Sequence, residues 1–78
     1  MQAVLVKWVD STGDGHWQDM DVAKLAQPHE VTTLGFLLDD SETHITIIQS
    51  FSDVQRSIDN LICIPKVAVV NVRKVRLP

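Results

Sequence analysis

Hydrophobic and polar residues alternate near the start of the chain, and this alternation predicts a β-strand. In the segment "AVLVKWVD", Val4, Val6 and Trp8 occupy every second position, with Leu5 and Lys7 between them. Successive side chains of a strand point to opposite sides of a sheet, so the three residues share one face. We expect a first strand whose Val4–Val6–Trp8 face is the better buried one.

A polar, glycine-containing stretch follows and then a segment of good helix formers. "STGDGHWQ" predicts a turn, and "DMDVAKLA" predicts a two-turn helix over residues 19–26. Asp19 is placed to cap the first turn, and Asp21 is favourable near the positive end of the helix dipole. Pro28 stops the helix, because proline disfavours helical geometry in the residue before it.

The second half of the chain predicts four more strands. Residues 30–40 are rich in β-branched and aromatic side chains, and Gly35 within them indicates a bend or a close backbone approach. Residues 41–51 predict the hairpin partner, and the polar residues 52–60 predict a loop. Residues 61–64 and 67–75 are expected to form the last two strands, on either side of a tight corner at Pro65–Lys66.

These elements indicate a mainly β fold in a single domain spanning residues 1–78. The chain has 78 residues, and a chain this short cannot divide its buried surface between two cores. Five short strands with one short helix after the first strand predict a strongly bent small barrel. A flat sheet with one small helix would leave an apolar face in water.

The last predicted strand carries apolar residues on both of its faces. Its valines do not keep to one alternating set; they are Val67, Val69, Val70, Val72 and Val75. A domain of this size has no second layer to cover both faces, and an uncovered apolar edge strand is a template for aggregation. We therefore expect the chain to form a homo-oligomer.

Charge is distributed unevenly along the chain. The formal net charge is −3, with seven Lys and Arg against ten Asp and Glu. Three of the seven bases, Arg73, Lys74 and Arg76, lie in the last six residues, so residues 1–72 carry 4 − 10 = −6. An acidic body repels phosphate backbones, which argues against duplex DNA as a partner.

Composition predicts a cytoplasmic protein without a membrane partner. Hydrophobic residues make up 45% and charged residues 22%, and no apolar run approaches the roughly 20 residues that span a bilayer. The N-terminal segment lacks the basic and apolar regions of a secretion signal. Cys63 is the only cysteine and lies in an apolar run, so we expect a buried, structural thiol in a reducing compartment.

Two patterns in the sequence could indicate a metal site, and neither is favoured. Residues 10–21 match part of a calcium-loop template, but the twelfth position holds Asp21 where a bidentate Glu is usual, and the preceding segment predicts a strand. The residues that match are Asp10, Thr12, Asp14, Gly15 and Asp21. The three histidines, His16, His29 and His44, lack the close spacing of a typical ligand pair. We expect no metal and no cofactor.

Catalysis is not expected either. Cys63 falls in a predicted buried strand, where nothing nearby in the sequence would activate its thiol. Trp8 and Trp17 would suit base stacking, but core packing is the favoured interpretation, with Trp17 anchoring the helix to the barrel. We expect a protein that is not an enzyme.

The order of these features resembles a group of small bacteriophage proteins with an Sm-like fold, an SH3-type small barrel. The resemblance is carried by Trp8 with Asp10, the turn at residues 15–17, the short acidic helix, "LGFLLDD" and "IPKVAV". In the Sm superfamily the fourth strand joins the fifth strand of a neighbour and closes a ring. The resemblance implies a host-cell cytoplasmic location and an oligomer interface at Ile62, Ile64, Val69, Asn71 and Arg73.

The resemblance also implies a place for a ligand. In RNA-binding relatives the turn between the last two strands and the loop between the second and third strands line a nucleotide pocket. The corresponding segments of this chain are Ile64–Lys66 and Asp39–His44. The resemblance therefore implies Lys66, His44 and Asp40 as ligand-binding residues. The relatives carry an Arg–Gly pair in the turn and an Asp…Asn pair in the loop, whereas this chain has Pro65–Lys66 and "DDSETH".

Two functions stay open on this basis. The favoured one is an oligomeric, non-enzymatic phage accessory protein that acts as a protein-interaction module for a host or phage factor. The alternative is a ring-shaped binder of RNA, an oligonucleotide or a small nucleotide, which could sequester a nucleotide signal. A ring would repeat a weak single contact around one face and so make it usable.

Overall fold

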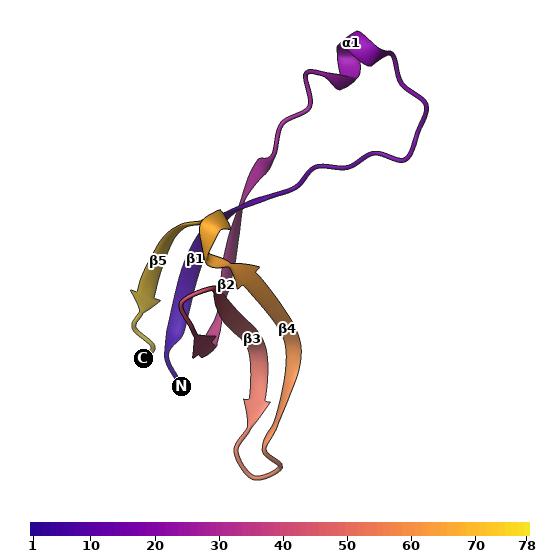
Figure 1. The fold of residues 1–78 in the computed structure, drawn as a ribbon. Coiled ribbons are helices and arrows are strands. Elements are labelled where there is room, and N and C mark those ends of the chain that lie inside the picture. The colour runs from indigo at the N-terminus through magenta and orange to yellow at the C-terminus, as the bar shows by residue number, and fades with distance from the viewer.

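The structure is a computed structural model that describes residues 1–78, and it contains five strands in one antiparallel sheet (Figure 1). The strands are β1 (Ala3–Asp10), β2 (His29–Asp40), β3 (His44–Ser52), β4 (Ser57–Pro65) and β5 (Val69–Val75). Their order across the sheet is β4-β3-β2-β1-β5. The mainly β fold is therefore confirmed, but the sheet is not closed into a barrel, because β4 and β5 lie at its opposite edges.

One small core holds the sheet together. Its buried side chains come from β1, β3 and β4 and are Val4, Val6, Trp8, Ile45, Ile47 and Ile64. The predicted inner face of β1 is confirmed, and the Trp8 indole Nε1 also donates a hydrogen bond of 2.9 Å to Thr33 Oγ1. Only nine of the 78 residues are buried, so a single chain excludes little apolar surface from water.

A bend or a close backbone approach was predicted at Gly35, and the close approach is confirmed between β2 and β3. A Cβ atom at Gly35 would lie 2.6 Å from Ile47 Cγ2 and 2.7 Å from the Ile48 carbonyl oxygen. Only glycine leaves room for the two backbones at this distance. The approach lets β2 pair with β1 through its first half and with β3 through its second half.

The break predicted at Pro65–Lys66 is also confirmed. β4 ends at Pro65, a 3-10 turn η1 (Lys66–Ala68) follows, and β5 begins at Val69. Proline, which has no backbone N–H, is tolerated here because β4 is an edge strand and some of its N–H groups have no partner strand. The turn carries the chain from one edge of the sheet to the other (Figure 1).

The loop predicted over residues 52–60 is wrong for most of its length. β3 continues through Ser52 and β4 begins at Ser57, which leaves only a four-residue turn. This end of β4 is exposed, so polar residues are tolerated in the strand and obscure the pattern on which the prediction relied. Asn60 has a φ of 55°, a left-handed conformation that asparagine adopts more readily than most residues.

The segment between β1 and β2 departs most from expectation. Residues 11–28, which we call the arm, project from the sheet and carry a single helical turn α1 (Met20–Ala23) near the tip (Figure 1). The predicted two-turn helix is thus too long, because nothing packs against it and short helices are marginal alone. The Trp17 side chain, expected in the core, is fully exposed. No helix in the structure is long and apolar enough to cross a membrane.

Candidate functional site

The β2–β3 loop and the junction between β4 and η1 lie side by side at one end of the sheet. The Lys66 backbone N–H donates to the Thr43 carbonyl oxygen at 2.9 Å, and His44 pairs with Pro65 in the β3–β4 ladder. The Ser41 N–H closes the loop by donating to the His44 carbonyl oxygen, also at 2.9 Å. These backbone contacts bring together the two segments that the sequence proposed as a ligand site.

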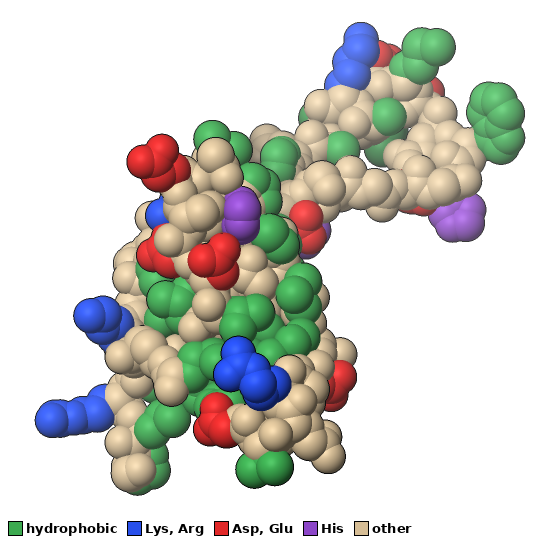
Figure 2. All heavy atoms as spheres, turned by 60° about the horizontal axis from the view of Figure 1, so that its bottom comes forward, with side chains coloured by type: hydrophobic (Ala, Val, Ile, Leu, Met, Phe, Trp, Pro, Cys, Tyr) green, Lys and Arg blue, Asp and Glu red, His purple; other side chains and the backbone are tan.

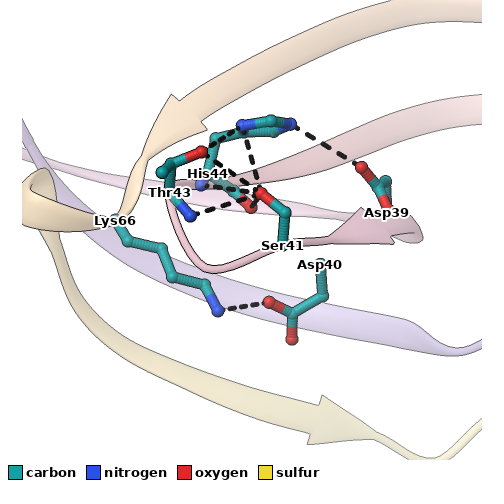
Figure 3. Close-up of polar contacts among 6 residues, drawn as sticks. All are labelled: Asp39, Asp40, Ser41, Thr43, His44 and Lys66. Atoms are coloured by element: carbon teal, nitrogen blue, oxygen red, sulfur yellow. Dashed lines mark hydrogen bonds and ion pairs between the residues drawn. The ribbon is translucent and has the colours of Figure 1, made fainter.

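Lys66 and Asp40, two of the proposed ligand residues, form an ion pair (Figure 3). The Lys66 Nζ contacts Asp40 Oδ1, and the two side chains are 41% and 49% exposed. The pair is open to solvent on one side, so its contribution to stability is small. Asp40 therefore balances the Lys66 charge within the single chain.

His44, the third proposed residue, is held by its neighbours in the loop (Figure 3). Its Nδ1 lies 2.9 Å from Thr43 Oγ1 and 3.2 Å from Ser41 Oγ, and its Nε2 lies 3.6 Å from Asp39 Oδ2. Ser41 Oγ also accepts hydrogen bonds from the Thr43 and His44 backbone N–H groups. Local contacts therefore fix the ring, with one nitrogen among hydroxyls and the other facing a carboxylate.

The charge of this cluster opposes a phosphate group. Asp39, Asp40 and Glu42 supply three negative charges against one positive charge from Lys66, a sum of −2 with His44 neutral. Protonation of His44 would bring the sum to −1. A phosphate that approached the loop would meet net repulsion at short range. The cluster therefore presents a net negative charge beside exposed hydrogen-bonding groups.

The structure places the predicted oligomer-interface residues in two different settings. Ile64 is fully buried in the core, and Ile62 and Val69 pack against that core while partly exposed. Asn71 and Arg73 are exposed on β5, where they line a pocket together with Leu5 and Lys7 of β1. The side chain of Ile64 thus belongs to the chain's own core, and only its backbone can serve an interface.

The two edge strands expose apolar residues, and the sequence predicted only some of them. Leu61 on β4 is 57% exposed, and Val70 and Val72 on β5 are 59% and 43% exposed. The exposure of the two valines agrees with the two-sided apolar pattern of the last predicted strand. The sequence gave no sign that Leu61 is exposed, because residues 61–64 look like a uniformly buried run. Each edge therefore combines unpaired backbone groups with apolar side chains.

Cys63 is exposed, which contradicts the expected buried thiol. It faces away from the core because it pairs with Thr46, while its neighbours Ile62 and Ile64 point inward. The run "LICI" conceals this alternation, since cysteine is itself apolar. No three His, Cys, Asp or Glu side chains gather where they could hold a metal ion, and the partial calcium template is spread along the exposed arm.

Comparisons with known proteins give no relative for this chain. No family model, no curated protein and no solved structure matches it. The resemblance to Sm-like phage proteins therefore stays a prediction, and the function must be argued from the fold and its surfaces.

Proposed function

We propose that the chain is a self-assembling, non-enzymatic protein-interaction module in which β5 of one copy pairs with β4 of the next. The strand order carries this proposal, because it leaves one unpaired edge on each side of a single sheet. The two edges differ, so the contact is head-to-tail, and repeated head-to-tail contacts close into a ring or extend as a fibre. A ring fits the closure that the Sm-like resemblance implies.

Surface composition supports assembly. Leu61 on one edge strand and Val70 and Val72 on the other are exposed in the single chain. Pairing these strands would cover the apolar side chains and satisfy the open backbone groups at the same time. The core of a single chain contains few buried residues, so a larger core shared between copies would stabilise the fold.

Interaction with a partner protein is favoured over nucleotide binding by the charge of the β2–β3 loop. The cluster of Asp39, Asp40 and Glu42 around Lys66 carries a net negative charge and exposes several hydrogen-bonding groups. A ring would present one such loop per copy on one face, where basic or polar groups of a host or phage protein could bind several at once. RNA or a small nucleotide would have to overcome the repulsion.

The exposed Cys63 on β4 offers a direct test of the edge contact. We would introduce a second cysteine on β5 in separate variants, at Val70, Asn71 or Val72, and oxidise each under mild conditions. Paired strands lie about 4.8 Å apart, within the range that a disulfide spans. A head-to-tail contact predicts a ladder of cross-linked species on a non-reducing gel for at least one variant.

The matched control carries the same β5 cysteine with Cys63→Ser. This control should give no ladder of cross-linked species, because β4 then has no thiol that can form a disulfide. A contact between two β4 strands would instead link Cys63 to Cys63 and stop at dimers, even in the unmodified chain. Dimers alone, or no cross-linking in any variant, would overturn the proposed edge pairing.

A further inference from the structure

The arm makes few contacts with the rest of the molecule and exposes several large apolar side chains. All residues from Ser11 to Glu30 are exposed, and Trp17, Met20 and Leu25 are among the exposed large apolar residues of the chain. Figure 2 shows hydrophobic side chains standing out from the projecting arm. The radius of gyration is 16.1 Å, whereas a compact chain of this length has about 11.5 Å. Tryptophan is the residue type most enriched at the centres of protein interfaces, so a fully exposed one indicates a contact still to be made.

Contacts at the base direct the arm away from its own sheet. The Thr12 hydroxyl donates to the Gln27 carbonyl oxygen at 2.7 Å and lies 3.0 Å from His29 Nδ1, which ties the two limbs together. Beyond this point the only ordered element is α1, capped by the Asp19 carboxylate. The arm continues in the direction of β1 and β2 and does not fold over them (Figure 1).

The tip of the arm combines an aromatic ring with acidic groups. Asp14, Asp19 and Asp21 surround Trp17 in the sequence, and Lys24 is the only base, so the arm carries a net charge of −2 with histidine neutral. A matching surface should offer cations and room for an indole. Guanidinium groups satisfy both needs, because they pair with carboxylates and stack on the face of an aromatic ring.

Such a surface exists on β1 and β5. A pocket there is lined by Leu5, Lys7, Asn71 and Arg73, which supply two cations, one apolar side chain and no acid. Arg76 adds positive charge near the C-terminus, whereas Lys74 pairs with Val4 and lies on the other face of β5. Among the residues that line this pocket, none neutralises Lys7 or Arg73 by an ion pair within the chain.

We propose that the arm of one copy docks in the β1–β5 pocket of a second copy. Trp17 packs on Arg73 and Lys7 there, and the neighbouring aspartates pair with the same cations. This inference rests on the proposed self-assembly, but it uses a different segment and different chemistry from the edge contact. It gives the arm a function, which is to reach across the joint between adjacent copies and lock it.

The reach of the arm fits this arrangement. The limb that carries Trp17 leaves from the end of β1. If β4 pairs with the next copy's β5, that strand lies four strand spacings from β1, or about 19 Å, and the next copy's β1 lies about 24 Å away. The seven residues from Ser11 to Trp17 span about 23 Å when extended. A fully extended limb therefore reaches the next copy's β5, where the Trp17 side chain can contact Arg73 on the β5 side of the pocket. Gly13 and Gly15, which have open space around them, allow the limb to turn.

Quenching of tryptophan fluorescence by acrylamide tests the docking, because the two tryptophans differ in burial. Trp8 is buried and Trp17 is exposed in the single chain, so subtracting the signal of a Trp17→Phe variant isolates Trp17. At concentrations where the chain is assembled, we expect Trp17 to be shielded from acrylamide and its emission to shift to shorter wavelength. Dilution to the monomer should restore the full quenching of free tryptophan.

The outcomes separate this inference from the proposed function. If light scattering shows an assembly in which Trp17 stays as accessible as free tryptophan, arm docking is overturned while self-assembly stands. If the chain is a monomer at every concentration, both are overturned. A monomer with a shielded Trp17 would mean that the arm folds onto its own chain, which also overturns docking in a second copy.

A charge-reversal pair gives a second, independent test. Asp14→Lys/Asp21→Lys makes the arm positive, and Lys7→Glu/Arg73→Glu makes the pocket negative, while both leave the Asp19 cap in place. Each variant alone should lose the shielding of Trp17, because like charges face each other. An equal mixture should recover it, since each arm then meets a pocket of opposite charge. Failure of the mixture to recover, with both variants folded and assembled, would contradict the proposed pairing.

Discussion

At Gly35 the fold depends on the absence of a side chain. β2 passes so close to β3 there that a Cβ atom would lie 2.7 Å from the Ile48 carbonyl oxygen, a backbone atom that cannot move aside by a rotamer change. We predict that Gly35→Ala lowers the free energy of unfolding by about 1–3 kcal/mol, as overpacking in a core does.

Chemical denaturation of the variant would measure this change. Gly13→Ala is the matched control, because nothing lies within 4 Å of the position where its Cβ would be, and we expect it to change stability by less than about 0.5 kcal/mol. If the two substitutions had equal effects, the close approach of β2 and β3 would be contradicted.

The Lys66–Asp40 ion pair is a surface contact and should behave as one. Both side chains are close to half exposed, so water screens the attraction. We predict that Lys66→Ala changes the free energy of unfolding by less than about 1 kcal/mol, measured by denaturant titration. Lys24→Ala, which removes a still more exposed pair with Asp21, is the control. A loss of several kcal/mol on Lys66→Ala would show that the pair is structural, so the cluster could not be free for a partner.

At the scale of elements, the unpaired edge of β5 is the feature on which the proposed assembly depends. Proline removes a backbone donor, and donors along a strand point alternately to its two neighbours. A proline scan from Val69 to Arg73, including Asn71→Pro, should therefore release smaller species at alternate positions, except at Val70, where the β1–β5 register shifts and interrupts the alternation. Circular dichroism should still report a folded sheet at those positions, since the donor lost there faces the neighbouring copy and not β1.

The remaining positions of the scan provide the internal control. Their donors face β1, so proline should weaken the fold itself and lower the melting temperature. Light scattering and thermal melts on the same samples distinguish the two classes. A scan in which every position keeps the wild-type mass, or in which mass and stability always fall together, would argue against an intermolecular ladder on β5.

The sequence predicted the strands well where one face of the strand is buried. In β1 the alternation of Val4, Val6 and Trp8 is a direct consequence of the core, and the structure confirms it. The same signal vanished at the exposed start of β4, where polar residues such as Asp59 and Asn60 occupy a strand. An exposed edge strand lacks the constraint that produces the alternation, so local pattern could not identify it.

Prediction from the sequence reached a similar limit at the arm and at the β2–β3 loop. Trp17 looked like a core residue because tryptophan usually is one, and only the spatial path of the arm places it in solvent. The proximity of Lys66 to Asp40 and His44 was implied by the resemblance to Sm-like proteins, and the structure brings these residues together. The ion pair did not, because no sequence pattern reports which carboxylate meets a lysine across two separate loops.

At the scale of the whole molecule, the single chain combines a small core with an open sheet and an extended arm. Nine buried residues hold together a body whose two edges and whose arm all present apolar side chains. Each of these features costs free energy in water unless a second surface covers it. Edge pairing would cover the two edges of the sheet, and arm docking would cover the arm. One assembly would therefore cover all of these apolar surfaces.

The molecular mass in solution tests this account most directly. Light scattering on the unmodified chain, followed over a series of concentrations, would report whether copies associate and whether growth stops. We predict one closed species larger than a dimer, with a mass that is a whole multiple of 8.7 kDa and does not grow as concentration rises. A chain that scatters as a monomer of 8.7 kDa throughout the micromolar range would contradict the edge contact and the ring built from it.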